Sequence, residues 1–127
     1  MFGSKLIFDQ EFTEANDVTE NLDKYYFKSC KFSKLKMEGG DFGTVMVFCM
    51  VSDCDLYWVS AISGLFVNTR FVGTAFRGVS FAGSIFVECS FLDCSFTKDN
   101  LGGDCDFGDA KFFDCEFQDT PGAPSAV

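Results

Sequence analysis

Phenylalanine returns at every fifth position over a long stretch of this chain, and this spacing restricts the possible folds more than any other feature. The uninterrupted run consists of Phe66, Phe71, Phe76, Phe81, Phe86, Phe91 and Phe96. A period of five matches neither the 3.6-residue turn of an α-helix nor the two-residue alternation of a strand. It fits a backbone that turns a corner every five residues, so that four sides close one coil. Successive coils then stack as parallel strands about 4.8 Å apart.

The same frame extends in both directions. Upstream, the central positions are Ala61, Leu56, Val51 and Met46. A step of four residues then leads to Phe42, Met37, Phe32, Phe27 and Leu22. The next position, Asp17, is not apolar, and Phe12 follows in the same frame. Downstream, the frame predicts Leu101 as the next centre, one extra residue within 102–106, and then Phe107, Phe112 and Phe117. On this count the expected vertical neighbours are Phe66, Phe86 and Phe107, then Phe71, Phe91 and Phe112, then Phe76, Phe96 and Phe117, and finally Phe81 and Leu101.

A second column, two residues before each centre, holds small side chains and confirms the register. All seven cysteines fall in it: Cys30, Cys49, Cys54, Cys89, Cys94, Cys105 and Cys115. The odd number of cysteines and their spacing of five or more do not suit a disulfide framework or a zinc site. We therefore expect free, buried thiols in a reducing compartment.

These two columns resemble the pentapeptide repeat family, in which a small residue and Asp or Asn precede a central Leu or Phe. The matching triplets are CDL at 54–56, CSF at 89–91 and 94–96, CDF at 105–107 and CEF at 115–117. The resemblance implies an all-β fold, a right-handed quadrilateral parallel β-helix of about five coils. It identifies the fold much more specifically than the function.

The frame divides the chain into three expected parts. Residues 1–21 are predicted to be an N-terminal cap with degenerate first repeats, 22–118 the β-helix, and 119–127 a disordered tail. Within the cap, Lys5 to Phe12 suits a strand, while Thr13 to Asn21 suits a loop, a short helix or a poor first coil. The start of the chain has no long apolar stretch of the kind found in secretory signals, and no apolar run approaches the ~20 residues that span a bilayer. We therefore expect a cytoplasmic protein with no membrane contact.

Nothing in the chain predicts catalysis. The sequence has no His, which removes the usual general base near neutral pH and the commonest metal ligand. It has no glycine-rich phosphate loop and no metal-spaced cluster, so we expect no enzymatic activity, no cofactor and no metal.

Function should therefore come from the outward positions. An apolar outer surface is predicted from residues that flank the centres: Val45, Val47, Leu65, Val67, Ile85, Val87, Val72, Leu92 and Phe113. Such a surface usually marks an interface. Three occupants are open: a second copy in a homodimer, another protein, or the N-terminal segment 1–11 folded back. The leading interpretation is a protein-binding scaffold or adaptor.

Charge supports a second hypothesis. The net charge is −9, which argues against direct nucleic-acid binding. An acidic surface is predicted at the C-terminal end from Glu88, Asp93, Asp104, Asp106, Asp109, Asp114, Glu116 and Asp119. Some members of the family are DNA mimics that protect or inhibit DNA gyrase and give fluoroquinolone tolerance, so the resemblance implies a topoisomerase as an alternative partner. The apolar middle coils and the lack of a C-terminal dimerisation helix do not suit that role.

Overall fold

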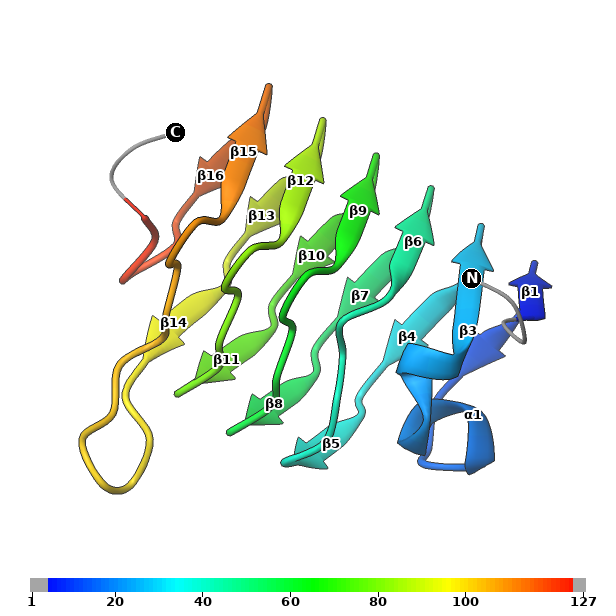
Figure 1. Cartoon of the computed structure of the whole chain (residues 1–127), viewed down its shortest axis with the longest axis horizontal. Coiled ribbons are helices and arrows are strands. Elements are labelled where there is room, and N and C mark those ends of the chain that lie inside the picture. Colours follow the sequence, from blue (N-terminus) through cyan, green and yellow to red (C-terminus); the bar gives the residue numbers. More distant parts are fainter. Residues whose placement is uncertain (1–4, 125–127) are drawn as a thin grey trace.

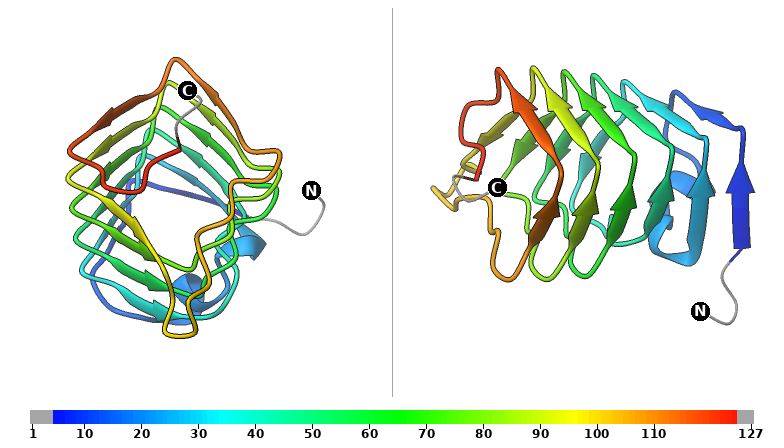
Figure 2. Two further views of the ribbon diagram at one scale, coloured as in Figure 1. Left: turned by 90° about the vertical axis from the view of Figure 1, so that its left-hand side faces the viewer. Right: turned by 90° about the horizontal axis from the view of Figure 1, so that it is seen from above.

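The chain winds into a stack of about five four-sided coils (Figures 1 and 2). This computed structural model describes residues 5–124. Each coil advances by one strand spacing, so that the long axis of the rod runs perpendicular to the strands (Figure 1). Because the corners come every five residues, most strands are only three residues long. The predicted fold class, a quadrilateral parallel β-helix, is confirmed.

Three sides of the rod are parallel sheets, called here the first, second and third sheet in chain order. The first sheet consists of β1 (Lys5–Phe8), β3 (Tyr25–Lys28), β6 (Val45–Val47), β9 (Leu65–Val67), β12 (Ile85–Val87) and β15 (Lys111–Phe113). The second consists of β2 (Glu11–Phe12), β4 (Lys31–Ser33), β7 (Met50–Ser52), β10 (Arg70–Val72), β13 (Ser90–Leu92) and β16 (Glu116–Gln118). The third consists of β5 (Lys36–Glu38), β8 (Asp55–Tyr57), β11 (Ala75–Arg77) and β14 (Ser95–Thr97). The fourth side is joined by isolated bridges that run through Asp41, Ser60, Ser80 and Asp106.

The parallel register places phenylalanine directly over phenylalanine inside the rod. Phe66 pairs with Phe86 and Phe71 with Phe91, and their rings stack with centroids 4.8 and 4.7 Å apart. Rings on adjacent sides meet edge to face, as Phe71 and Phe76 do at 5.9 Å. All seven members of the uninterrupted run are buried, as predicted. Each contributes about 1.5–3 kcal/mol by burial, and each stacked pair adds ~0.5–1.5 kcal/mol.

The small column is selected by hydrogen bonding as well as by size. The Thr69 hydroxyl donates to the Met46 carbonyl (3.3 Å), and the Cys89 and Cys94 thiols donate to the carbonyls of Phe66 (3.1 Å) and Phe71 (3.2 Å). Each bond links a coil to the one before it. Ser, Thr and Cys are therefore interchangeable here, because all three are small and all three donate. All seven cysteines are free thiols.

The corners require a backbone conformation that few residues adopt. The residue after each first-sheet strand has a φ near +50°, as at Phe48 (55°), Asn68 (48°) and Glu88 (52°). In this left-handed region Gly, Asn and Asp are tolerated, whereas other residues cost roughly 1–2 kcal/mol. The Asp, Asn and Gly residues of the repeats therefore gather at the corners.

The N-terminal end is an incomplete coil. Strands β1 and β2 extend the first and second sheets, but a short helix, α1 (Asp17–Glu20), and a 3-10 turn (Leu22–Lys24) follow them. Asn16 caps α1, because its side-chain oxygen accepts from the N–H groups of Val18 (2.9 Å) and Thr19 (3.1 Å). Of the three forms open for 13–21, the chain adopts the helix. Asp17, where the frame expects an inward residue, is exposed in it, since an unpaired carboxylate is costly to bury.

The predicted core position of Leu101 is wrong. Leu101 is 88% exposed and lies in a loop between β14 and Cys105. The Asp99 carboxylate organises this loop by accepting from the N–H groups of Leu101 and Gly103, both at 2.8 Å. A loop longer by a whole repeat leaves the frame unchanged, and so the spacing of aromatic residues does not reveal its length.

The longer loop moves every later residue to a neighbouring side. Phe107 stacks on Phe81 (5.2 Å), not on Phe86 as predicted. The remaining two stacks are Phe112 on Phe86 (4.8 Å) and Phe117 on Phe91 (4.7 Å). By the same shift, Cys115 lies over Cys89, because β13 pairs Ser90 with Glu116.

The C-terminal coil is only partly covered. Phe107, Phe112 and Phe117 are half-buried, since no further coil stacks on them. The start of the expected tail forms a turn there: the Phe96 N–H donates to the Pro121 carbonyl (2.9 Å), and Ala123 packs against the core. The rest of that tail, 125–127, lies outside the described residues.

Candidate protein interface

The first sheet presents two columns of side chains to the outside of the rod. Because each central residue points inward, its two neighbours point outward. The parallel register aligns the first column as Leu6, Tyr26, Val45, Leu65, Ile85 and Lys111. It aligns the second column as Phe8, Lys28, Val47, Val67, Val87 and Phe113. The apolar and aromatic members of these columns are called the apolar face below.

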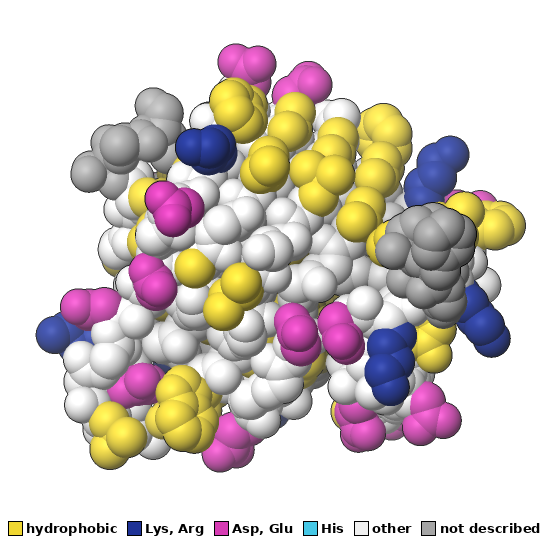
Figure 3. Space-filling view, viewed as in Figure 1, with side chains coloured by type: hydrophobic (Ala, Val, Ile, Leu, Met, Phe, Trp, Pro, Cys, Tyr) yellow, Lys and Arg dark blue, Asp and Glu magenta, His cyan; other side chains and the backbone are white. Residues whose placement is uncertain are grey.

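The apolar face is exposed although its side chains are large. Leu65 and Ile85, at its centre, are 37% and 38% exposed, and Phe113 is 50% exposed. Figure 3 shows hydrophobic side chains gathered across the ends of β6, β9, β12 and β15. Isolated apolar residues are normal on a protein surface, but a contiguous patch usually marks a binding surface. The sheet beneath it is held by the stacked core, so that the face is preformed.

Most residues of the predicted interface lie together on this face. They are Val45, Val47, Leu65, Val67, Ile85, Val87 and Phe113. Val72 and Leu92 lie elsewhere, since they are outward residues of the second sheet, aligned with Ser52 and Gln118. The expected stacking of Phe112 on Phe91 would place Phe113 with Val72 and Leu92. Phe113 instead pairs with Val87, because of the long loop before it.

Sequence reasoning missed three residues of the face: Leu6, Phe8 and Tyr26. Leu6 and Phe8 flank Ile7, and Tyr26 precedes Phe27, which is a buried centre on the same side. The signal was present, because extending the rule of inward centres and outward neighbours to Phe27 and Ile7 identifies all three. With them, the face runs the whole length of the first sheet.

Charged groups mark the two ends of the apolar face. Lys28 interrupts the second column near its N-terminal end, between Phe8 and Val47. Lys111 ends the first column beyond Ile85. Carboxylates stand at the corner beside the second column, where Asp9 follows β1, Glu88 follows β12 and Asp114 follows β15. Lys28 and Asp114 therefore lie near opposite ends of the same edge.

The predicted acidic residues surround the C-terminal coils and do not form one face. Glu88 and Asp114 share one corner, Asp93 and Asp119 the next, and Asp106 and Asp109 belong to the fourth side. Asp104 lies in the long loop, 3.8 Å from the Lys98 ammonium group. Only Glu88, Asp114 and Glu116 come together, around a shallow hollow that also contains Arg70.

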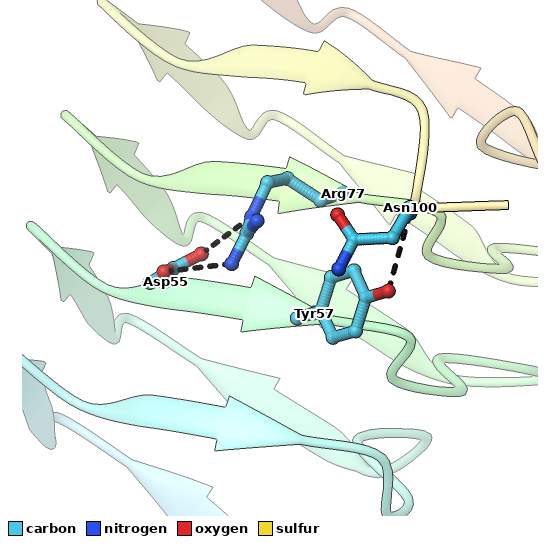
Figure 4. Close-up of polar contacts among 4 residues, drawn as sticks. All are labelled: Asp55, Tyr57, Arg77 and Asn100. Carbon is cyan, nitrogen blue, oxygen red and sulfur yellow. Dashed lines mark hydrogen bonds and ion pairs between the residues drawn. The ribbon is translucent and has the colours of Figure 1, made fainter. Parts of the chain in front are cut away.

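A polar cluster on the third sheet ties neighbouring coils together (Figure 4). The Arg77 guanidinium donates to both carboxylate oxygens of Asp55 (3.1 and 3.0 Å) and lies 4.7 Å from the centre of the Tyr57 ring. The Tyr57 hydroxyl accepts the N–H of Asn100 from the long loop (3.2 Å). Both charged side chains are more than a third exposed, so that the ion pair contributes only about 0–1 kcal/mol. Each group already has a partner, which favours a structural role.

The buried thiols of Cys49, Cys54 and Cys89 are held in their protonated form. Burial raises the pKa of Cys49 and Cys54 to about 11 and that of Cys89 to about 12. The thiolate is the reactive form of cysteine, so these side chains are poor nucleophiles at neutral pH. Over residues 5–124 no three potential ligands lie close enough to hold a metal ion, and no helix is long and apolar enough to cross a membrane.

A cleft of about 270 Å³ lies between α1 and the edge of β5. Its walls include Leu35 and Met37 on one side and Ala15 and Thr19 on the other. The buried Thr19 hydroxyl is already hydrogen-bonded to Asn16. The cleft thus has no unpaired buried polar group to orient a ligand, and the apolar face remains the stronger candidate site.

Comparison with solved structures supports the fold class reached from the repeats, that of the pentapeptide repeat proteins. The chain is similar to Rfr23, a pentapeptide repeat protein from the cyanobacterium Cyanothece 51142, with a TM-score of 0.66. The two are 7% identical, over 91% of this chain and 84% of that chain, a likeness that shows the fold alone. The resemblance read from the sequence is thereby confirmed.

A second similar structure is QnrB1, a plasmid-mediated fluoroquinolone resistance protein. It is 14% identical over 93% of this chain and 83% of that chain, with a TM-score of 0.27. No protein-family model and no curated protein matches the chain.

Proposed function

We propose that this chain is a non-enzymatic protein-binding scaffold that makes its contacts through the apolar face. The observation that carries the proposal is that each of the six paired strands contributes at least one apolar or aromatic side chain to that face. Covering exposed apolar surface yields about 25 cal/mol per Å². Because the core fixes the backbone beneath, binding costs little ordering of the scaffold itself.

The rest of the molecule favours binding over chemistry. The thiols of Cys49, Cys54 and Cys89 are protonated near neutral pH. The one bidentate ion pair among residues 5–124 is engaged between coils. A solenoid of this kind offers a repetitive flat surface, which suits a protein partner better than a small molecule.

The test places a charge in the centre of the face. Leu65→Glu with Val67→Glu should abolish association with both self and other proteins, as measured by light scattering of the purified protein and by quantitative affinity capture. Val72→Glu, on the second sheet, is the matched control and should leave association intact. If the double variant and the wild type associate equally with every partner, the proposed function is wrong.

Acidic mimicry of DNA, with a topoisomerase as partner, is a second candidate, favoured by the net charge of −9. The distribution of the carboxylates around several corners supports it less well than a single acidic face would. A DNA gyrase supercoiling assay, with and without a quinolone, tests it. Unchanged supercoiling at excess protein removes this candidate and leaves the scaffold function untouched.

A further inference from the structure

The charges around the apolar face are arranged so that a second copy of the chain fits it. At the corner beside the second column, Asp114 follows Phe113 at the C-terminal end. In the second column itself, Lys28 lies near the N-terminal end, and Asp9 stands at the corner one strand beyond it. In a reversed copy about an axis through β9, Asp9 falls beyond β15 of the partner. A partner that matches this edge must carry the two charges in the opposite order along the rod, which a reversed copy of the same face does.

Two face-to-face arrangements that align the long axes of the two rods have twofold symmetry, the common symmetry of homodimers. If the axis runs along the strands and passes through β9, the two rods are antiparallel. Each side chain then faces the same column at the mirrored strand: Leu65 meets Leu65, and Lys28 meets Phe113 beside Asp114. Lys111 likewise meets Tyr26. Both lysines that interrupt the apolar columns thus oppose an aromatic ring, a favourable cation–π contact.

In the other arrangement the axis runs along the rod, and the two rods are parallel. The corner before β15 then faces the corner after it. Those corners hold Asp109 and Asp114, so that carboxylate opposes carboxylate at the most acidic end of the molecule. Like charges across an interface are unfavourable. In this arrangement too each lysine faces an aromatic ring, Lys28 facing Tyr26 and Lys111 facing Phe113. The carboxylates at the corners are therefore what distinguishes the two arrangements, and they favour the antiparallel one.

We propose, resting on the function proposed above, that the occupant of the apolar face is a second copy of this chain, packed antiparallel about a twofold axis through β9. The overlap from β3 to β15 is roughly 19 Å long at a strand spacing of about 4.8 Å. This places the contact at the small end of specific interfaces, and the dimer dissociates on the order of micromolar to tens of micromolar.

Sedimentation equilibrium of the full chain, from about 1 μM to about 500 μM, measures the association. The wild type is expected to pass from monomer to dimer over this range. Leu65→Glu brings two carboxylates together at the axis and should leave only monomer, with an unchanged far-UV circular dichroism spectrum because Leu65 is an outward residue. Val72→Glu, on the second sheet, should dimerise like the wild type.

Carbodiimide cross-linking followed by peptide mass spectrometry tests the orientation. It joins an amine to a carboxylate only where the two groups touch. Within one copy, Lys28 and Asp114 are separated by the strands β6, β9 and β12, roughly 19 Å. A Lys28–Asp114 link can therefore form only between copies. It is expected in the cross-linked dimer and absent from the monomer.

A charge exchange supplies the independent check. Lys28→Glu should weaken dimerisation about tenfold, and Asp114→Lys in the same chain should restore it, because the pair is re-formed with its signs reversed. A dimer that lacks the Lys28–Asp114 link and does not respond to the exchange overturns the antiparallel arrangement. A monomer at every concentration overturns self-association. In that case the scaffold function stands if Leu65→Glu abolishes binding of a different protein. It fails if Leu65→Glu changes the binding of no protein.

Discussion

At the scale of single residues, each place in the five-residue repeat imposes its own demand. The centre needs an apolar side chain that packs on that of the adjacent coil, the small position needs a compact side chain, which where it is Ser, Thr or Cys also donates to a carbonyl, and the corner needs a positive φ. Phe48 and Trp58 meet the last demand poorly, with φ of 55° and 60°. They are also 57% and 61% exposed, so little packing offsets the strain.

Replacing Trp58 with Asn should stabilise the protein. Asn tolerates the left-handed region, and the change removes a strain of roughly 1 kcal/mol while little buried surface is lost. The free energy of unfolding, measured in urea, should rise by about that amount. Ile62→Asn is the control: Ile62 is 48% exposed but has no positive φ, so no gain is expected. A loss of stability in Trp58→Asn would show that contacts of the Trp58 ring outweigh the backbone strain.

The buried thiols make stability fall at alkaline pH. The pKa of Cys89 is raised from 9.0 to about 12 in the folded chain. The folded state therefore holds its proton more tightly, and the stabilisation is complete below pH 9 and is lost as pH rises toward 12. Thermal melting between pH 8 and 11 should show a falling Tm.

Cys89→Ala isolates this effect from the titration of Lys and Tyr. Its Tm should fall less steeply with pH than that of the wild type, and equal slopes would contradict the assignment. The same burial predicts that thiol reagents label Cys89 only after unfolding. A reducing, cytoplasmic location remains a prediction.

At the scale of elements, the strands are too short to be stable alone, and each is held by the strands before and after it. The long loop after β14 departs from this regularity. It is closed by Asp99, whose N–H also donates to the Gly103 carbonyl (2.9 Å), and it reaches Tyr57 through Asn100. No large side chain of the loop enters the core, since Leu101 projects into solvent.

Deleting residues 99–104 should leave the fold intact. Lys98 would then serve as an ordinary corner, and the regular five-residue step would resume at Cys105. The free energy of unfolding should change by no more than about 1 kcal/mol, because loop closure depends weakly on length. Equilibrium unfolding in urea measures it. The single substitution Leu101→Asp should leave the free energy of unfolding unchanged. Strong destabilisation by either change would indicate that Leu101 packs in the core.

At the scale of the whole molecule, the stack is nearly one-dimensional, because each coil contacts only its neighbours. Its two ends are therefore special: β1, β2 and α1 cover the first coil, and the turn at 119–124 crosses the last. The apolar face exists only at this scale, since each coil contributes at most two side chains to it, one in each column. The division of the chain at residues 21 and 118 remains a prediction.

The spacing of residues alone determined the inward phenylalanines, the column of small side chains and most of the apolar face. The sequence pattern was sufficient because a corner at every fifth residue forces each central side chain to point into the rod. For Val45, Leu65 and Ile85, the offset from the nearest centre is enough to place the side chain outside.

Only the tertiary structure decided which side each residue after 97 occupies. A periodic frame gives the length of an insertion only to within whole repeats, so that one extra residue and one residue plus a repeat look the same. Hydrogen-bond register between coils resolves the difference, and it seats Phe107 on Phe81 and Phe113 beside Val87. The loop can take either length at little cost, because closure entropy rises slowly with length, whereas stacked rings and paired strands permit only one alignment.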